Sequence, residues 1–354
     1  MKDNKIHTVV MVGNSEHSGG GIASVINLIR KMPVWEKYGI KLLATQKDGN
    51  KLTKFWCVFK AAIKAPFVIA RCKIVHFQMV PGITLLTQLP ALLSAKLFRK
   101  KVVMSVHVGN QLENYASDRS FKWWFRRADL VLLLAKRWEK LFKESYADVK
   151  VSTDVLYNAC EMRPFIPMEE KKKLILFAGT LDKNKALDLL LKAWASIKDK
   201  YPEWRIAVLG SGDRPYFEAM SNDLGCSDSV SFKGYVVGEE KELYFHDASI
   251  LCLCSYMEGF PMAVLEAWSH GIAVVTTPVG GLPDVIEDGS NCVVFPTGDY
   301  MKLAEQLDSL ISKESLRMRV GEEGYRCAQS KFSSEAISEK IDFIYSNLLE
   351  NNHN

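Results

Sequence analysis

Short apolar runs rich in Val, Ile and Leu alternate with amphipathic stretches along most of the chain. Twelve runs have the length and composition of buried strands; they are 7–12, 40–45, 73–79, 101–106, 129–134, 152–157, 173–178, 204–209, 229–232, 249–253, 272–276 and 292–295. Helical patterns separate most of them, for example at 22–32, 119–127, 137–145, 186–200 and 301–311. Repeated strand–helix units predict an α/β fold, with parallel sheets covered by helices on both faces in two Rossmann-like domains.

One apolar stretch is long enough to be considered as a membrane span. Residues 74–95 contain no Asp, Glu, Lys or Arg, and their length would permit a crossing. Polar side chains such as His76 are spread through the stretch, however, and a Pro-Gly pair interrupts it. We therefore predict a strand at 74–79, a turn and a helix at about 84–98.

Length and charge both favour two domains. A chain of 354 residues exceeds what one hydrophobic core commonly supports. Residues 1–165 hold 27 Lys and Arg against 12 Asp and Glu, a net charge of +15, whereas the remainder holds 19 against 29, a net charge of −10. The division falls at 161–173, where two prolines and a charge run indicate a linker. We expect domains at 1–165 and 166–330, and a C-terminal helix at 331–354 that crosses back to the first domain.

Cysteine usage and the first residues indicate the compartment. The eight cysteines show no CxxC pair and no regular spacing, which favours reduced thiols over disulfides or a zinc site. The first apolar run is short and ends in a glycine-rich turn, as expected for a first strand rather than a signal peptide. We therefore predict a cytoplasmic protein.

Glycines follow three predicted strands of the second half. In parallel sheets, ligands bind at the carboxyl ends of the strands, and glycine lets the backbone approach a ligand closely. The positions are Gly179 with the nearby Lys185, the Gly210-Ser211-Gly212 turn, and Gly234. Lys185 could also be an ordinary surface charge, and Lys183 is a competing candidate.

The segment EGFPMAVLEA, residues 258–267, contains two glutamates around a Gly-Phe-Pro turn. Glu258 could simply cap the following helix, and Glu266 could be a solvated helix residue. Pro261 is suited to the first helical position, where its missing N–H has no consequence. The free backbone N–H groups of Met262, Ala263 and Val264 would then face a ligand. The positive end of the helix dipole would point the same way.

Together these motifs make the chain resemble a retaining nucleotide-sugar glycosyltransferase of the GT-B fold, glycosyltransferase family 4. The resemblance covers roughly residues 8–300, in the order of the family's motifs: Gly19-Gly20-Gly21, SVHVGN with His107, LYNACE with Asn158, Gly179 with Lys185, Gly210-Ser211-Gly212, Gly234, and Glu258 with Glu266, with seven residues between them, followed by GIAVVTTPVGGLPDVI. It implies two Rossmann-like domains whose sheets face a central cleft, and a nucleoside-diphosphate sugar as donor.

The resemblance also gives roles to individual residues. His107 and Glu258 would act at the transferred sugar, and Glu266 would accept hydrogen bonds from the ribose hydroxyls. The expected donor contacts are Gly20, Gly21, Thr180, Lys185, Gly210, Gly212, Tyr235, Gly259, Phe260, Pro261, Met262, Ala263, Val264 and Glu266. The Gly19–Gly21 segment could form only a tight turn, and His107 could be a structural histidine. Asn158 is more typical of a turn and is left out of the site.

Two departures from the family pattern affect the diphosphate site. Many relatives have Arg where this chain has Thr180, and Gly where it has Ala186. A hydroxyl can bond a phosphate but brings no charge, so the diphosphate would depend more on Lys185. The chain has no Asp-x-Asp, and we therefore expect no donor-chelating metal and no cofactor.

The basic first half suggests the acceptor. Residues 51–73, 97–101 and 121–129 interleave Lys and Arg with apolar side chains, including Trp56, Trp123 and Trp124. Such segments are typical of an anionic membrane surface, with the tryptophans as interfacial anchors. The alternative is a core-facing helix with an ordinary basic solvent face. Nucleic acid is a weaker candidate, because no nucleic-acid motif is present and the second half is acidic.

We therefore expect a metal-independent enzyme, peripheral on the inner face of the plasma membrane. It would transfer a hexose-type sugar from a UDP-sugar or other nucleoside-diphosphate sugar to a lipid-linked glycan of capsule, exopolysaccharide or lipopolysaccharide. A non-catalytic GT-B module that binds a sugar nucleotide or acts as a scaffold is the second hypothesis, motivated by Thr180. A GT-B epimerase or phosphorylase is the third.

Overall fold

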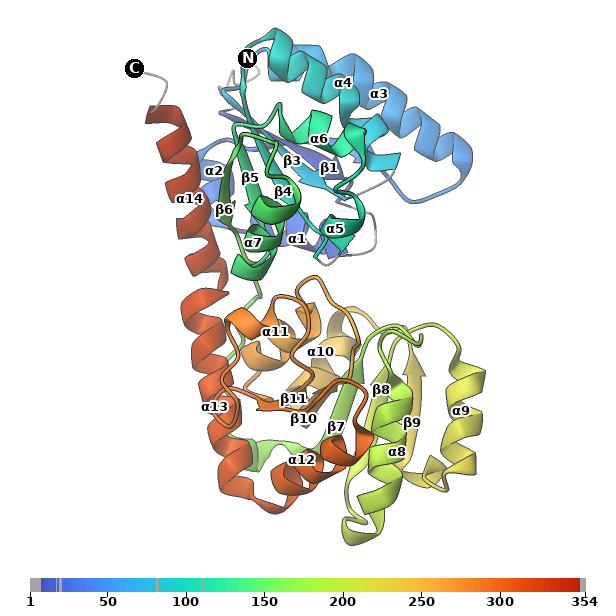
Figure 1. The fold of residues 1–354 in the computed structure, drawn as a ribbon. Coiled ribbons are helices and arrows are strands. Elements are labelled where there is room, and N and C mark those ends of the chain that lie inside the picture. The colour runs from blue at the N-terminus through green and yellow to red at the C-terminus, as the bar shows by residue number, and fades with distance from the viewer. Residues whose placement is uncertain (1–7, 17, 19–20, 81–82, 110, 351–354) are drawn as a thin grey trace. The chain divides into compact units, whose positions relative to one another are not determined.

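The structure, a computed structural model, forms two compact units (Figure 1). It describes residues 8–16, 18, 21–80, 83–109 and 111–350. The first unit comprises residues 1–159 and 334–354 of the chain, and the second comprises 160–333. Each unit contains one six-stranded sheet, and the α/β fold predicted from the sequence is confirmed.

The first sheet has the strand order β2-β1-β3-β4-β5-β6 and is parallel throughout. Its strands are β1 (Val9–Asn14), β2 (Lys41–Gln46), β3 (Ile74–Met79), β4 (Lys101–Val106), β5 (Leu130–Leu133) and β6 (Ser152–Val155). All six positions of β3 are buried, as expected for a strand covered on both faces. The strand order reverses between β1 and β3, so ligands are expected at the carboxyl ends of these strands.

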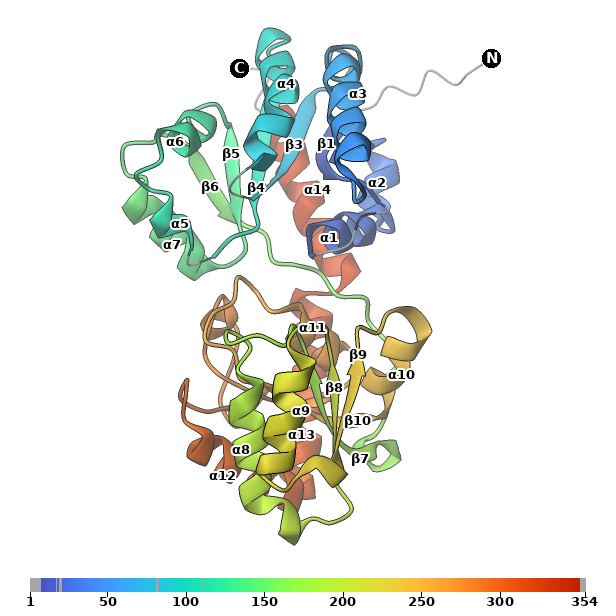
Figure 2. The same ribbon diagram turned by 90° about the vertical axis from the view of Figure 1, so that its right-hand side faces the viewer.

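The helices of the first unit cover both faces of its sheet. They are α1 (Gly21–Arg30), α2 (Pro33–Lys37), α3 (Lys51–Ile69), α4 (Ile83–Leu97), α5 (Gln111–Asn114), α6 (Arg119–Phe125), α7 (Lys136–Ser145) and α14 (Ser334–Glu350). Helices α1, α2 and α14 share a core with β1, and this core contains Ile26 and Ile341. Helices α3 and α4 lie side by side (Figure 2) and contact the edge strand β2. The predicted strand at 74–79 and helix near 84–98 are therefore confirmed as β3 and α4.

Two of the three predicted tryptophan anchors do not fit that role. Trp124 is 3% exposed and packs edge-on against Phe77, with ring centroids 5.7 Å apart. Trp123 is partly buried, and the Arg127 guanidinium lies 3.5 Å from its ring centroid. The short helix α6 turns its apolar face toward the core, which buries the Trp124 ring and leaves the Trp123 ring only partly accessible. Only Trp56 is exposed among the tryptophans, all of which lie in the described part of the chain.

The second sheet has the order β12-β11-β10-β7-β8-β9, again with parallel pairing. Its strands are β7 (Lys172–Ala178), β8 (Arg205–Leu209), β9 (Val230–Gly234), β10 (Ala248–Leu253), β11 (Ala273–Thr276) and β12 (Val293–Val294). The chain adds β8 and β9 on one side of β7, then returns to place β10 on the other. The switch point of this sheet therefore lies between β7 and β10.

Large apolar side chains fill the core of the second unit. Its helices are α8 (Leu187–Ile197), α9 (Arg214–Asp223), α10 (Gly238–Asp247), α11 (Met262–Ser269), α12 (Tyr300–Ser312) and α13 (Glu314–Lys331). Leu190 and Trp194 of α8 are fully buried, and α8 packs on α12. The indole N–H of Trp194 donates to Ser229 Oγ at 2.9 Å, so burying this polar group leaves no donor unpaired.

All twelve predicted strands are present, with ends that differ by a few residues. None of the helices in the described ranges combines the length and apolar character that a bilayer crossing requires. All eight cysteines are free thiols, seven of them buried.

Candidate functional site in the second unit

The loops that follow β7 and β10 meet at the switch point of the second sheet. Lys185 Nζ, from the first loop, lies 2.5 Å from Glu258 Oε1, from the second. Ser255 Oγ donates to the same carboxylate oxygen at 2.7 Å. The side chains of Lys185 and Glu258 are only 21% and 11% exposed. A cation and an anion from distant parts of the sequence are therefore fixed where this sheet type binds ligands.

Backbone contacts hold the two loops together. Tyr256 N–H donates to the Asn184 carbonyl at 2.8 Å, and the Asn184 side chain donates to the Met257 carbonyl at 2.9 Å. A third loop, after β11, closes on Glu258 from the other side. A Cβ added to Gly280 would lie 2.8 Å from Glu258 Cβ, and Gly280 has a φ of +67°. Only glycine satisfies both requirements at this position without strain.

The loop after β7 contains a small hydrogen-bonded turn around Asp182. Thr180 Oγ1 donates to one carboxylate oxygen at 2.6 Å, and Lys185 N–H donates to the other at 2.9 Å. Burial alone would raise the pKa of Asp182, but these hydrogen bonds and the Lys185 charge hold it below its ordinary value. Thr180 therefore presents a hydroxyl beside a carboxylate and brings no positive charge to this loop.

Helix α11 begins one residue later than predicted. Pro261 is the N-cap residue, with φ −73° and ψ 112°, and Met262 is the first helical residue. The Val264 N–H already donates to the Pro261 carbonyl at 3.2 Å, so the prediction of a free N–H at Val264 was wrong. Phe260 and Val264 are 5% and 0% exposed. Their side chains belong to the core, which leaves only backbone atoms to face a ligand.

The accessible face of α11 is formed by Met262, Ala263 and Glu266, which are partly exposed while their helical neighbours are buried. Glu266 forms an ion pair with Lys241 Nζ of α10 at 2.8 Å. Sequence reasoning missed Lys241 because its distance along the chain from Glu266 leaves no local signal. It also missed Ser255, although a hydroxyl three residues before Glu258 was visible in the sequence.

Residues 160–327 match the sequence model of the family described as "Glycosyl transferases group 1". These residues contain both loops, α11 and the Lys185–Glu258 pair. This range makes up nearly all of the second unit, which therefore resembles a group 1 glycosyltransferase domain.

Curated relatives agree with this assignment over part of their length. The chain is 30% identical over 186 residues to D-inositol 3-phosphate glycosyltransferase of Corynebacterium jeikeium, covering 50% of this chain and 44% of that protein. It is 25% identical over 276 residues to N-acetyl-alpha-D-glucosaminyl L-malate synthase of Bacillus anthracis, covering 72% and 70%. The alignments span about half the length of several such relatives.

Solved structures share the fold of the whole chain. Alr3699/HepE of Anabaena, in complex with UDP, has a TM-score of 0.76 at 16% identity and covers 96% of this chain and 100% of that one. Sucrose-phosphate synthase of Thermosynechococcus elongatus has a TM-score of 0.77 at 15% identity, covering 97% and 99%. The chain therefore has the GT-B fold.

Two predicted glycines of the second unit have a packing role. A Cβ on Gly210 would lie 1.7 Å from the Gly179 carbonyl oxygen, and one on Gly212 would lie 2.4 Å from the Leu181 carbonyl oxygen. The loops after β7 and β8 are thus in direct backbone contact, and the glycines permit it.

Two other predicted donor contacts lie elsewhere in the second unit. Tyr235 follows β9 at the edge of the sheet and is 73% exposed. Gly259 is partly buried, and its carbonyl accepts from Gly281 N–H at 2.9 Å.

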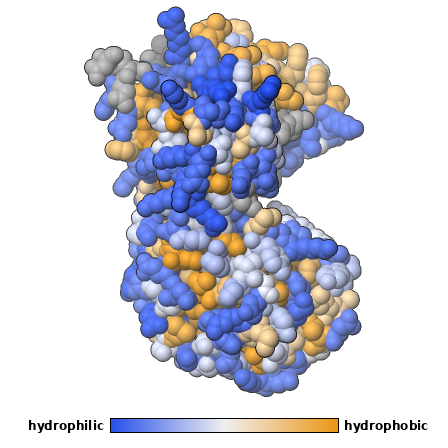
Figure 3. Space-filling view, viewed as in Figure 1, coloured by the Kyte–Doolittle hydropathy of each residue, from blue (hydrophilic) through white to orange (hydrophobic). Residues whose placement is uncertain are grey.

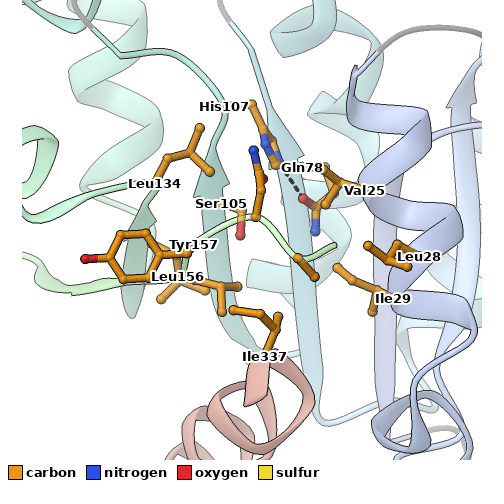
Figure 4. A pocket seen from close by; sticks show the side chains of 13 residues that line it. Val25, Leu28, Ile29, Gln78, Ser105, His107, Leu134, Leu156, Tyr157 and Ile337 are labelled. Atoms are coloured by element: carbon orange, nitrogen blue, oxygen red, sulfur yellow. Dashed lines mark hydrogen bonds between the residues drawn. The ribbon is translucent and has the colours of Figure 1, made fainter. Parts of the chain in front are cut away.

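The remaining predicted residues belong to the first unit. His107 follows β4 and is partly buried at a small cavity of about 20 Å³ (Figure 4), about one water molecule in size. Burial lowers the pKa of His107 to about 4, so its ring is neutral at pH 7. Gly21 is the exposed first residue of α1, and Gly20 lies outside the described residues.

A buried polar network supports His107. Its Nε2 lies 2.6 Å from Gln78 Oε1, which makes Nε2 the donor and leaves Nδ1 as an acceptor. Behind Gln78, His76 Nε2 lies 2.7 Å from Ser105 Oγ and His76 Nδ1 lies 2.6 Å from the Tyr345 hydroxyl of α14. The C-terminal helix therefore contributes to the surroundings of a candidate catalytic residue, which no sequence motif indicated.

Proposed function

We propose that this chain transfers a sugar from a nucleoside-diphosphate sugar, with UDP favoured, to a lipid-linked glycan of a cell-surface polysaccharide. The transfer would retain the anomeric configuration and would not require a metal ion. The observation that carries the proposal is the Lys185–Glu258 ion pair at the switch point of the second sheet.

The chemistry of sugar transfer explains the need for such a pair. Breaking the bond between the sugar and the diphosphate develops negative charge on the leaving phosphate and positive charge at the anomeric carbon. Fixed groups that match these charges lower the barrier, because they need no reorganisation during the reaction. Lys185 would neutralise the leaving phosphate, and Glu258 would bind sugar hydroxyls and orient the ring. Ser255 would hold the carboxylate in place.

The first turn of α11 would supply the remaining phosphate contacts. The N–H groups of Met262 and Ala263 precede the first intrahelical donor, Val264, and the positive end of a helix dipole favours an anion. Glu266, on the same face, would accept from both ribose hydroxyls, displacing or sharing Lys241. Solved structures of the same fold support UDP as the nucleotide, since Alr3699/HepE is described in complex with UDP and with UDP-glucose.

His107 would contact the transferred sugar as a neutral group. With Nε2 donating to Gln78, the free Nδ1 can accept a hydrogen bond from a sugar hydroxyl. This tautomer assigns His107 an orienting role rather than that of a general acid at neutral pH.

The proposed acceptor rests on the charge of the first half of the chain. Its net charge of +15 favours an acceptor held at an anionic membrane surface. The named acceptors of curated relatives, an inositol phosphate and malate, are small and anionic. A soluble anionic acceptor is therefore the alternative that an acceptor screen has to include.

The decisive experiment is hydrolysis of a panel of UDP-sugars by the purified chain. We expect slow hydrolysis of at least one donor, unaffected by EDTA, and a loss of about 100-fold or more in Glu258→Gln. Glu240→Gln, an exposed carboxylate on α10, is the matched control and should leave the rate unchanged. Once an acceptor is found, the NMR spectrum of the product should show the retained anomeric configuration.

Two outcomes would contradict the proposal. Abolition of activity by EDTA with rescue by manganese would mean that the diphosphate site depends on a metal ion. UDP binding without hydrolysis or transfer of any donor would favour the non-catalytic module, for which the uncharged Thr180 beside Asp182 is the supporting observation.

A further inference from the structure

Helix α3 buries its small side chains and exposes its large ones. Ala61 and Ala65, which face the rest of the unit, are 4% and 1% exposed. Six large apolar residues recur at helical spacing on the opposite side and are all exposed: Leu52, Phe55, Trp56, Phe59, Ile63 and Phe67. Phe67 is 71% exposed. An amphipathic helix that only served the core would have the reverse arrangement.

Helix α4 extends the same apolar surface. Three leucines share one side of this helix and are exposed: Leu86 by 71%, Leu93 by 53% and Leu97 by 74%. Phe98 follows directly and is also exposed. We call these residues, with the six of α3, the α3–α4 face. Figure 3 shows apolar side chains gathered over these two helices. Soluble monomers rarely expose contiguous apolar surface of this extent without a binding partner.

The aromatic rings of the α3–α4 face contact one another rather than the core. The rings of Phe55 and Phe59 are stacked with centroids 6.1 Å apart, and Trp56 meets Phe59 edge-on at 5.5 Å. Packing among themselves keeps the three rings at the surface as one cluster. Such a cluster is suited to the boundary between lipid headgroups and acyl chains.

Cations surround this apolar surface, and of these Lys96 and Lys101 pair with an acid, Asp129. Between Asp48 and Glu113 the sequence contains ten Lys and Arg and no Asp or Glu. Within the described part of the chain, Lys51, Lys54 and Lys60 form no ion pair. A groove of about 780 Å³ lies beside α3, along the edge strand β2. It is lined by Lys47, Lys60 and Lys64, and Trp56 also lines it.

We propose that the α3–α4 face docks this chain on an anionic lipid bilayer. The apolar side chains would enter the acyl boundary, and the lysines of the groove beside β2 would bind lipid phosphates. Charge complementarity selects this partner, because a second copy of the chain would bring two basic surfaces together. The role of docking rests on the proposed function: docking would place the enzyme near a lipid-linked acceptor.

The first experiment removes the apolar contribution. Binding is measured by co-sedimentation with mixed phosphatidylglycerol and phosphatidylcholine vesicles. The triple variant Phe55→Ser, Phe59→Ser, Phe67→Ser should lower the partition coefficient at least about tenfold, because each phenyl ring contributes to insertion. The matched control changes three exposed apolar residues elsewhere, Leu243→Ser, Met301→Ser and Phe343→Ser. It should bind vesicles like the natural sequence.

The second experiment separates charge from insertion. The variant Lys54→Ser, Lys60→Ser, Lys64→Ser should lose the preference for phosphatidylglycerol over pure phosphatidylcholine vesicles. Its control changes the exposed Lys233, Lys313 and Lys331 to Ser. High salt should release the phenylalanine variant completely and the natural sequence only in part, because salt screens charges but does not weaken apolar insertion.

A third measurement locates the surface directly. Of the tryptophans only Trp56 is exposed, so brominated lipids should quench fluorescence in the natural sequence and not in Trp56→Phe. Quenching that persists in Trp56→Phe, or equal binding of both triple variants and their controls, would overturn the assignment of this face. Self-association in solution that is lost in the phenylalanine variant would instead identify a second copy as the occupant.

Vesicle binding is measured without turnover, and its failure is therefore distinguishable from failure of the proposed activity. A protein that hydrolyses UDP-sugar but ignores anionic vesicles would overturn the docking inference alone. A protein that docks through the α3–α4 face but hydrolyses no donor would contradict the activity and leave the docking surface in place.

Discussion

Helices α3 and α8 show two opposite uses of large apolar side chains. In α8, Leu187, Leu190 and Trp194 are all fully buried. In α3, Phe55 and Phe59 are exposed. Both helices are rich in apolar residues, so apolar content alone does not determine what a helix is for. The direction of the large side chains distinguishes a helix that builds a core from one that presents a surface.

Two lysines of the candidate site also differ from those of α3, because the former are paired with acids and the latter, among the described residues, are not. In the second unit, Lys185 and Lys241 are each paired with a glutamate of the candidate site. Such pairs fix the position of a carboxylate, which an enzyme site requires. On α3, Lys54 and Lys60 have no such partner in the described part of the chain. Unpaired cations at a surface remain available to an anionic partner.

Replacing one aromatic residue of each helix by alanine gives the largest expected difference, which is a difference in stability. Trp194→Ala should lower the free energy of unfolding by about 3–5 kcal/mol, because it leaves a cavity and removes the hydrogen bond that the indole donates to Ser229. Phe59→Ala should change it by less than about 0.5 kcal/mol, as expected for an exposed position. Chemical denaturation followed by circular dichroism measures both. A large loss in Phe59→Ala would show that the α3–α4 face is part of the core.

Glu266→Ala tests the paired charges of the second unit. If Glu266 accepts from the ribose, UDP should bind more weakly by about 1–3 kcal/mol, measured by calorimetry, while the thermal unfolding temperature stays unchanged. Lys241→Ala removes the partner of Glu266 and should strengthen UDP binding slightly, because the carboxylate no longer has to leave an ion pair. Unchanged UDP affinity in Glu266→Ala would refute the ribose role.

The strands were predictable because buried parallel strands are continuous apolar runs. β3 and β10 are buried at every position, and both were identified from composition alone. The orientation of α3 was not predictable. Periodicity shows that Phe55, Phe59 and Ile63 share a face, but not whether that face meets the sheet. For the same reason Trp124 was predicted at the surface and lies in the core.

The candidate site was predictable only where its residues are local in sequence. The spacing of Glu258 and Glu266 and the proline before α11 were visible as one motif. The ion pair between Lys185 and Glu258 required the strand order, which places β7 beside β10. Lys241 of α10 reaches Glu266 of α11, and Tyr345 of α14 reaches His76 of β3. Both contacts depend on tertiary packing, and no local pattern encodes them.

The neutral histidines of the first unit predict a pH dependence of stability. Burial, with a smaller contribution from His107, lowers the pKa of His76 to about 3. The unfolded chain therefore binds a proton that the folded chain does not, and stability falls as pH drops below about 6.5. Each such histidine should cost about 1 kcal/mol between pH 7 and pH 5.5.

The variant His76→Gln keeps a hydrogen-bonding side chain and cannot titrate. Denaturation midpoints of this variant should therefore depend less on pH than those of the natural sequence. His246→Gln is the control, since His246 is exposed, and it should keep the full dependence. Parallel pH curves for His76→Gln and the natural sequence would mean that His76 has the same pKa in the folded and the unfolded chain.

The smallest expected effect concerns Ala186, which precedes α8 and has the left-handed conformation, with φ 51° and ψ 45°. Glycine there would relieve a backbone cost of about 1–2 kcal/mol. It would also lose about 0.5–1 kcal/mol to the greater freedom of the unfolded chain and about 0.8 kcal/mol from one buried methyl group. These contributions nearly cancel, so Ala186→Gly should change stability by no more than about 0.5 kcal/mol.

Ala186→Val adds bulk to a fully buried position and a β-branch to a left-handed one, and it should be clearly destabilising. UDP affinity would show whether the loop still presents Lys185: it should be unchanged in Ala186→Gly and weakened in Ala186→Val. If valine were tolerated in both measurements, the left-handed turn would not be what places Lys185 beside Glu258.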